Sequence, residues 1–367
     1  MKIGLFLGAG ASVPFGMPTT EGLRSKIQKF GSVSREEEVL QSFLTNPKYP
    51  DIEYVLQAVS DVIKFSRSRG GDFFFSHGSG SLRFDSGTLD FNQFINKVVQ
   101  VEADLEGYIY ENYRWKSSYK PQVKEIYDEI FSFLKSNSDS IRIFTTNYDR
   151  IIEEFCHSRG HYRLVDGFER NPTHSEISKW TGNFEVDNRD GITNVHLYKL
   201  HGSLNWKEHE DHGIIKTNEE SKSPDSNFKR NLVVMPTLSP KEEEEVEPFS
   251  SIISEFEKNM MKLDGLIVIG FSFRDQGINR IFNKFIQSGK ALVVLSPSSM
   301  KNVCQNLLHF DVPKNYDKNK VSSQAPSTGH VWCIPHELGP QSIKSDLETV
   351  ALAHIKKSFK MLNNFDS

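Results

Sequence analysis

Several short apolar runs in this chain stop abruptly at glycine or at small polar residues, a pattern typical of buried parallel strands. The runs cover residues 3–7, 141–145, 195–200, 265–270 and 291–295. Segments with apolar residues at helical spacing, such as 250–262 and 277–288, lie between several of them. This alternation predicts an α/β fold with a parallel, doubly wound sheet. Ligands bind beyond the carboxyl ends of the strands in such sheets, so the residues that follow each run are candidate site residues.

A mainly helical region is expected between the first two strands. Apolar residues recur at helical spacing over 51–65, 89–113 and 121–134. We therefore expect residues 1–367 to form a single domain with a helical insertion at about 35–138. Further expectations are a helix beginning near Ser12, a mobile loop at 66–88, and a polar, irregular stretch with an edge strand at 160–194. A surface excursion at 207–229 and a closing helix at 342–362 are also expected.

Composition narrows the classes of protein that the chain can represent. The formal net charge is -4, which argues against general binding of nucleic acid through the surface. No apolar run approaches the roughly 20 residues of a membrane span, and the short run at the start leads directly into a glycine turn. These features predict a cytoplasmic location. The three cysteines are far apart in the sequence and no HExxH motif occurs, so neither a disulfide framework nor a metal site is expected.

The first strand is followed by a glycine-rich loop that contains the candidate residues Gly8, Ala9, Gly10 and Ser12. Glycines after a strand and before a helix let the backbone approach a pyrophosphate, and a helix N-terminus supplies N–H donors. The third glycine of the full dinucleotide fingerprint is absent, because position 13 is valine. The alternative interpretation is a tight turn that binds no ligand.

The strand at 141–145 is followed by the candidate residues Thr146, Asn147 and Asp149. An amide can hold a ribose hydroxyl or a water molecule without adding charge, and a neighbouring carboxylate can orient either. The alternative is helix capping, since Asn147 or Asp149 is well placed to cap a helix that begins near residue 150.

His201 follows the strand at 195–200 and would bring an imidazole to the same edge of the sheet. A histidine can act as a base near neutral pH, although a lone one at a strand end is more often a packed residue. Gly270 and Ser272 follow the next strand, and Ser296 the one after it. These three are candidates for nucleotide binding, with ordinary β–α turns as the alternative. Taken together, the strand ends indicate a dinucleotide cradle that faces one imidazole and one amide.

The ordered set Gly-Ala-Gly-x-Ser, Thr-x-Asn-x-Asp, Leu-His-Gly and Ile-Gly-x-Ser resembles the sirtuins, NAD-consuming enzymes on a Rossmann-like fold. The residues within these motifs are similar to those of the sirtuin-like NAD hydrolases of bacterial antiphage defence, which include HerA-associated, Argonaute-associated and Thoeris proteins. The resemblance implies catalytic roles for Asn147, His201 and Asp149. It also implies that the Gly8–Ser12 loop binds phosphate and that Gly270 and Ser272 form a second nucleotide loop.

Two departures from the protein-deacylating sirtuins bear on the activity. The four zinc cysteines that follow the catalytic histidine in those enzymes are missing, and Pro18-Thr19-Thr20-Glu21 stands where they carry Asp-Phe-Arg. The resemblance therefore implies an NAD+ glycohydrolase that releases nicotinamide and ADP-ribose, with NAD as substrate and no metal. Since uncontrolled NAD hydrolysis would harm the host, we also expect a homo-oligomer and a partner such as a HerA-type ATPase or a short Argonaute.

Three other functions remain open at this point. A protein deacylase or ADP-ribosyltransferase would use NAD with another acceptor, and the missing cysteines argue against it. A non-catalytic nucleotide-binding scaffold would need neither Asn147 nor His201. A dehydrogenase would place an acidic residue about 20 positions after the glycine loop on a second strand, but Glu36–Glu38 fall in a helical region.

Overall fold

The computed structural model describes residues 2–30, 35–71, 81–84, 87–170, 177–218, 220, 228–233, 245–309, 322–324 and 330–334. The chain divides into two compact units. Unit 1 contains residues 1–17, 114–234 and 242–367, and unit 2 contains residues 18–113 and 235–241. The single-domain organisation with an insertion remains a proposal, and the expected helix at 342–362 lies outside the described residues.

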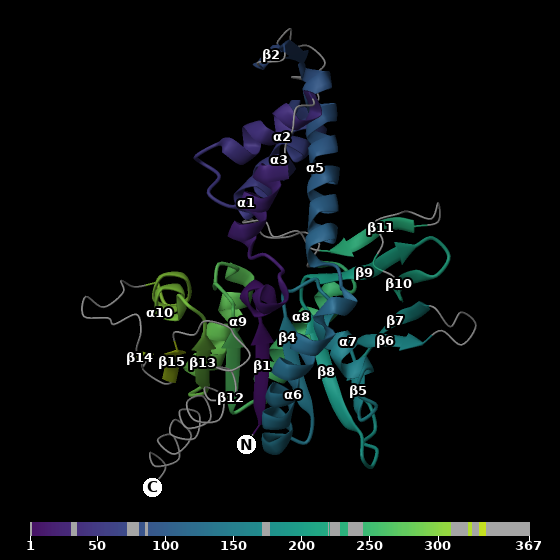
Figure 1. Cartoon of the computed structure of the whole chain (residues 1–367), viewed down its shortest axis with the longest axis vertical. Coiled ribbons are helices and arrows are strands. Elements are labelled where there is room, and N and C mark those ends of the chain that lie inside the picture. Colours follow the sequence, from purple (N-terminus) through teal and green to yellow (C-terminus); the bar gives the residue numbers. More distant parts are fainter. Residues whose placement is uncertain are drawn as a thin grey trace. The chain divides into compact units, whose positions relative to one another are not determined.

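Unit 1 is built on an eight-stranded sheet of order β14-β15-β13-β12-β1-β4-β8-β5 (Figure 1). Its strands are β1 (Ile3–Leu7), β4 (Ile141–Thr145), β5 (Tyr162–Val165), β8 (Thr193–Lys199), β12 (Gly265–Ile269), β13 (Ala291–Leu295), β14 (Ser322–Gln324) and β15 (His330–Ile334). All neighbouring strands are parallel except the pair β14–β15. Every residue of β1, β12 and β13 is buried, as expected for strands covered on both faces.

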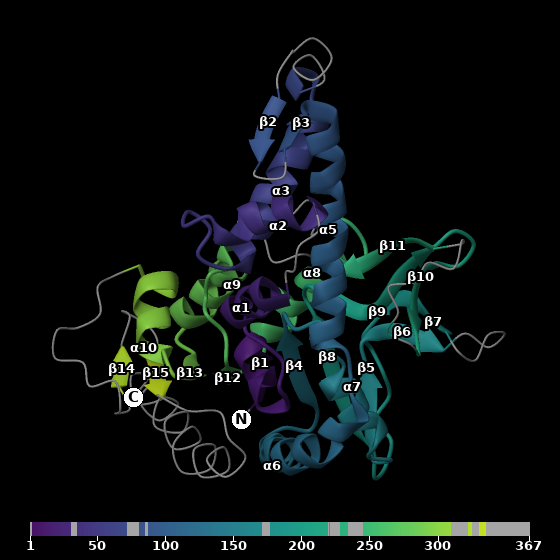
Figure 2. The same ribbon diagram turned by 45° about the horizontal axis from the view of Figure 1, so that its top comes forward.

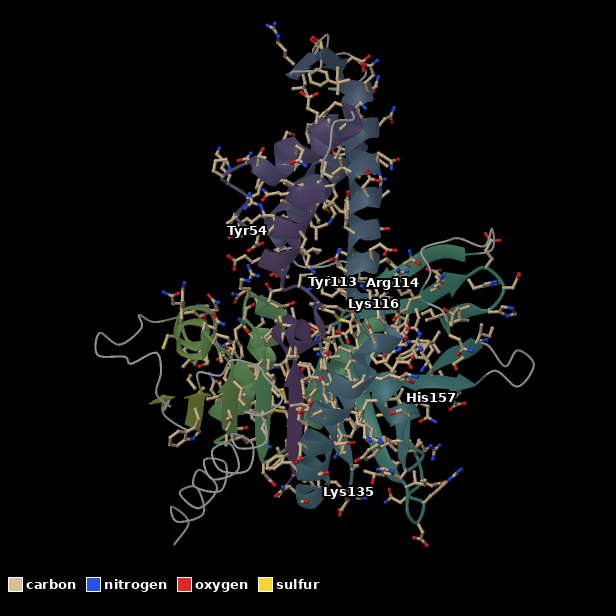
Figure 3. The ribbon with its side chains drawn as sticks, in the orientation of Figure 1. Tyr54, Tyr113, Arg114, Lys116, Lys135 and His157 are labelled. Atoms are coloured by element: carbon tan, nitrogen blue, oxygen red, sulfur yellow. The ribbon has the colours of Figure 1, made fainter. Side chains whose placement is uncertain are left out.

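Helices cover both faces of this sheet, which confirms the predicted α/β class with a parallel central sheet. They are α6 (Lys120–Asn137), α7 (Ile151–His157), α8 (Phe249–Met260) and α9 (Gln276–Gln287), followed by α10 (Ser299–Asn302) and a π-helical turn at Val303–Leu307. On one face, Phe6 packs against Phe256 of α8 and Phe282 of α9. Helices α6 and α7 cover the opposite face (Figure 1). Their last turns contain the exposed residues Lys135 and His157 (Figure 3), where a positive charge complements the helix dipole.

A second, five-stranded antiparallel sheet corrects two expectations. Its order is β11-β9-β10-β7-β6. The strands are β6 (Gly167–Arg170), β7 (Ile177–Asn183), β9 (Gly202–His209), β10 (Gly213–Thr217) and β11 (Phe228–Val233). Within the stretch expected to be irregular, residues 167–170 and 177–183 form β6 and β7, and 213–217 within the stretch 207–229 forms β10, which pairs with β9. Trp206 of β9 gives the reason, because it is buried against Phe168 of β6 with ring centroids 4.8 Å apart.

Unit 2 consists of α1 (Thr20–Phe30), α2 (Arg35–Thr45), α3 (Ile52–Arg67), α5 (Phe91–Tyr113) and the hairpin β2 (Ser81–Phe84) with β3 (Gly87–Asp90). Figure 2 shows the hairpin beside α5. The mainly helical character agrees with the sequence pattern. The expected loop at 66–88 is partly wrong, since α3 extends to Arg67 and residues 81–84 pair with 87–90; residues 72–80 and 85–86 lie outside the described residues.

Candidate active site

The loops that follow β1 and β12 pack backbone against backbone, and this contact explains three of the candidate glycines. The amide of Gly8 donates to the Ile269 carbonyl at 2.9 Å, and that of Gly10 to the Gly270 carbonyl at 2.9 Å. A Cβ atom on Gly8 would lie 2.6 Å from the Gly270 carbonyl oxygen, and one on Gly10 would lie 2.7 Å from the Gly270 Cα. Glycine is thus required here by loop packing, whether or not a pyrophosphate binds.

We predict that Gly270→Ala destabilises the protein strongly. Gly270 has φ of 65°, and its added Cβ would overlap the amide nitrogen of Ala11. The left-handed backbone alone costs about 1–3 kcal/mol for a residue with a side chain, and the overlap adds to it. Gly16→Ala is the matched control, because Gly16 has φ of 80° but no atom within 4 Å of the added Cβ. Urea unfolding should show a clearly larger loss for Gly270→Ala, and equal losses would contradict the close packing.

The element after the glycine loop differs from the expected α-helix. Residues Ala9–Phe15 form a 3-10 helix that contains Pro14 and ends at Gly16. The first α-helix, α1, begins only at Thr20. The glycine loop therefore cannot draw on the dipole of a long helix, and any contribution to anion binding rests on its own backbone N–H groups.

Asn147 links the loop after β4 to the glycine loop. Its amide nitrogen Nδ2 donates to the Gly8 carbonyl at 3.0 Å and to Ser12 Oγ at 3.1 Å. The backbone of neighbouring Thr146 donates to the Leu7 carbonyl at 3.2 Å. Asn147 is half-buried. Because its N–H groups are used within the protein, its oxygen Oδ1 is the group suited to accept a hydrogen bond from a ligand.

Asp149 is buried and joins the same two loops. Ser12 Oγ donates to its Oδ2 at 2.7 Å, and the amide of Ile151 donates to its Oδ1 at 3.1 Å. The second contact is a turn just before α7, whose N-cap is Arg150 without a side-chain cap hydrogen bond. The expectation that Asn147 or Asp149 caps this helix is therefore wrong. Burial raises the pKa of the Asp149 carboxyl, against the opposing effects of Lys199 and Ser12. These contacts suit Asp149 to holding the two loops in place, so that it would act on a ligand through Ser12 and Asn147.

Lys199 holds the loop after β4 from behind and was missed by sequence reasoning. Its side chain is 1% exposed. Its Nζ atom donates to the backbone carbonyls of Asp149 and Tyr148, and it forms an ion pair with Glu153 Oε1 at 2.9 Å. A lysine between Tyr198 and Leu200, at the end of a strand expected to be buried, was the available signal, because a buried ammonium group requires partners.

His201 lies at the end of β8 and pairs with an acid from a distant part of the chain. It is 7% exposed, and its Nε2 atom lies 3.2 Å from Asp275 Oδ2. Asp275 is itself held as the N-cap of α9, where its Oδ1 accepts from the Ile278 amide at 3.1 Å. A carboxylate beside an imidazole fixes the ring orientation and stabilises its protonated form. Sequence reasoning gave Asp275 no role; its position just before a helix was the only signal.

The other two strand ends present hydroxyl groups. Ser272 Oγ accepts from Arg274 Nε at 3.4 Å, and the Ser272 carbonyl accepts from Asn306 at 2.8 Å. Ser296 follows β13, and its Oγ atom is buried without a hydrogen-bond partner among the described residues. Because a buried polar atom normally finds a partner, an unpartnered hydroxyl here fits a position that a ligand would contact.

The contacts described above join the loops after β12, β1, β4 and β8 into one continuous edge. The glycine loop contacts Gly270 on one side and Asn147 on the other. The start of β9, directly after His201, contacts the loop after β4 through Ser203 Oγ, which donates to the Tyr148 carbonyl at 3.2 Å. His201 then reaches Asp275 beyond β12. All of these predicted positions thus lie at the carboxyl ends of neighbouring parallel strands, where α/β sheets bind ligands.

Comparison with known proteins finds a family model that matches part of this site. The family model of the SIR2-like domain matches residues 141–309, a range that contains Asn147, Asp149, His201 and Gly270 but excludes the glycine loop. No curated protein matches the chain.

Two solved structures show a slight overall similarity. A Sir2 homologue in complex with NAD shares 13% identity with a TM-score of 0.43, over 96% of this chain and 90% of that chain. A Sir2 protein bound to an acetylated peptide shares 12% identity with a TM-score of 0.41, over 96% of this chain and 94% of that one. Similarities of this size support no argument about activity.

The remaining features concern the cysteines, possible metal ligands and possible membrane-spanning helices. Cys156, Cys304 and Cys333 are free and buried. Within the described ranges, no group of three metal-ligating side chains is found and no helix is long and apolar enough to cross a membrane.

Proposed function

We propose that the chain is an NAD+ glycohydrolase that cleaves the bond between nicotinamide and ribose. The observation that carries the proposal is the pairing of two groups at adjacent strand ends: His201 oriented by Asp275, and Asn147 fixed by the glycine loop. The SIR2-like match over this region supports NAD as the substrate. The unpartnered Ser296 hydroxyl offers a contact for the rest of the dinucleotide.

The reaction needs a water molecule, a base and an environment for developing positive charge on the ribose. The C–N bond to nicotinamide breaks, and its electron pair leaves with the nicotinamide nitrogen. The water oxygen bonds to the same ribose carbon, and its proton passes to His201 as general base. Asp275 stabilises the resulting imidazolium, and Asn147 Oδ1 accepts a hydrogen bond that orients the water or a ribose hydroxyl. No step requires a metal.

The test is direct measurement of NAD consumption by the purified full chain, with products separated by chromatography. The proposal predicts nicotinamide and ADP-ribose in equal amounts from the wild type. Asn147→Ala should lose most of the activity, because it removes the orienting amide. Intact NAD after incubation with enzyme in molar excess would contradict the proposal, and so would full activity of Asn147→Ala.

We further propose that this activity depletes NAD in the cytoplasm during antiphage defence, as in the bacterial proteins that the sequence resembles. A hydrolase of this kind must be restrained in uninfected cells. We propose restraint through homo-oligomerisation and a partner protein such as a HerA-type ATPase or a short Argonaute, with the helical unit 2 as a candidate surface. NAD turnover measured across protein concentrations, beside light scattering, tests the oligomer. A specific activity independent of oligomeric state would contradict it.

A further inference from the structure

A second polar site lies at the opposite, amino-terminal ends of β4 and β8. Arg142 of β4 and His196 of β8 are register partners on adjacent parallel strands, so their side chains leave the same face of the sheet. Two residues further along each strand, and so on the same face, Phe144 and Tyr198 are likewise partners and stack with ring centroids 5.1 Å apart. Phe256 of α8 covers Phe144. Helix α8 thus seals the apolar pair and leaves Arg142 and His196 beside a cavity.

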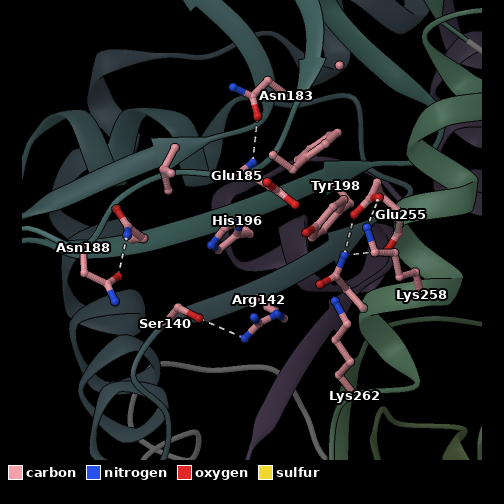
Figure 4. Close-up of a pocket in the computed structure, with 15 residues that line it drawn as sticks. Ser140, Arg142, Asn183, Glu185, Asn188, His196, Tyr198, Glu255, Lys258 and Lys262 are labelled. Carbon is pink, nitrogen blue, oxygen red and sulfur yellow. Dashed lines mark hydrogen bonds and ion pairs between the residues drawn. The ribbon is translucent and has the colours of Figure 1, made fainter.

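The cavity has a volume of about 520 Å³, within the range of small-molecule sites. Strands β4 and β8 form its floor, the end of α8 one wall, and the segment after β7 the other (Figure 4). Lys258 and Lys262 come from the α8 wall, and Asn188 from the other. The cavity is separate from the strand-end loops, since none of the proposed catalytic residues lines it.

Positive charge in this cavity exceeds the acid available to neutralise it. Glu255 is already engaged, because it pairs with Lys258 at 2.7 Å and accepts from Asn259 at 2.8 Å. Arg142 donates to Ser140 Oγ at 2.9 Å, while its buried Nε has no hydrogen-bond partner among the described residues. Among those residues, neither Arg142 nor Lys262 forms an ion pair. The remaining acid, Glu185, is exposed on the far wall.

His196 lines the same cavity as the two cations Arg142 and Lys262. Burial, then Arg142, and also Lys262 lower the pKa of the His196 imidazole to about 4, against the opposing effect of Glu255. At neutral pH the ring is therefore uncharged and can donate one hydrogen bond from an N–H group. A guanidinium, an ammonium and an imidazole N–H around one cavity form a donor set suited to a dianion.

We propose that this cavity binds a phosphate group, seated between Arg142, His196 and Lys262. The volume leaves room for a small molecule attached to the phosphate, and the amides of Asn188 and Asn194 line that part. The inference does not depend on the proposed NAD cleavage, because it concerns different residues at the other end of the sheet.

The experiment follows the His196 ring proton by NMR at neutral pH while inorganic phosphate or ribose 5-phosphate is added to the full chain. Chloride at matched ionic strength is the blank, and His196→Gln assigns the signal. We expect a saturable shift with either phosphate probe and none with chloride. Tighter binding of ribose 5-phosphate would identify a phosphate ester as the ligand, and equal affinity would identify free phosphate; both support the site.

Two variants decide whether the named cations hold the phosphate. Arg142→Gln and Lys262→Gln should each weaken binding about tenfold or more, since each removes a charged donor. Lys262 is exposed, so its variant keeps the test valid if Arg142→Gln fails to fold. Lys284→Gln is the matched control, because Lys284 is an exposed cation on α9 paired with Glu257 outside the cavity. No saturable shift, or unchanged affinity in both cavity variants, would overturn the proposal.

Discussion

His201→Ala is expected to lower the rate of NAD cleavage by about 10²–10⁴-fold, the contribution of a general base. The imidazole is held by Asp275 at 3.2 Å, at the strand end next to that of Asn147. Asp275→Asn should give a smaller loss, because the base remains while its charged partner is removed. The measurement is the turnover number for nicotinamide release.

His157→Ala is the matched control for this prediction. His157 is an exposed histidine at the end of α7, and its loss should leave turnover unchanged. Circular dichroism and thermal melting should show that His201→Ala is folded. If folded His201→Ala kept wild-type turnover, the role as general base would be contradicted. His201 would then be a packed residue, the alternative interpretation of a lone histidine.

Lys199→Met is expected to lower the free energy of unfolding by about 3–5 kcal/mol, the usual effect of removing one partner of a buried ion pair. The substitution leaves the Glu153 carboxylate buried without its ammonium partner and removes the donor to the Tyr148 and Asp149 carbonyls. Urea unfolding measures the loss. Because Asp149 and Asn147 lie on the loop that Lys199 holds, NAD cleavage should also fall.

The double variant Lys199→Met/Glu153→Met separates the charge effect from the packing effect. Replacing both members of a buried pair by apolar residues is often close to neutral. The double variant should therefore recover part of the stability that Lys199→Met loses. A loss below about 1 kcal/mol in the single variant, the size expected at a solvated surface pair, would contradict the buried network.

The central strands β1, β4, β8, β12 and β13 were predictable because their apolar runs are short and bounded by glycine or polar residues. The helices between them were predictable from apolar residues at helical spacing. The same reasoning explains why the loops after β1, β4, β8 and β12 could be named in advance as one edge. Most strands of the antiparallel sheet were missed because they mix charged and apolar residues. Trp206 is buried by Phe168, which lies far away in the sequence, and no local pattern reports that contact.

Within the candidate site, single positions were easier to anticipate than the contacts between them. His201 and Asn147 stand directly after strong strand signals. Asp275 could not be paired with His201, because 74 positions separate them in the sequence. They meet only because β12 and β8 end at the same edge of the folded sheet. The turn at the glycine loop was predicted correctly. The 3-10 helix that follows it contains Pro14 and ends at Gly16, and a pattern of alternating strands and helices does not predict such a short element.

The most direct test of the proposed hydrolysis is the rate of nicotinamide release from NAD with and without an acetylated peptide. Our account predicts the same rate in both samples, ADP-ribose as the product in each, and a peptide that keeps its acetyl group. Nicotinamide release that requires the peptide, together with its deacetylation, would contradict the account and establish a protein deacylase.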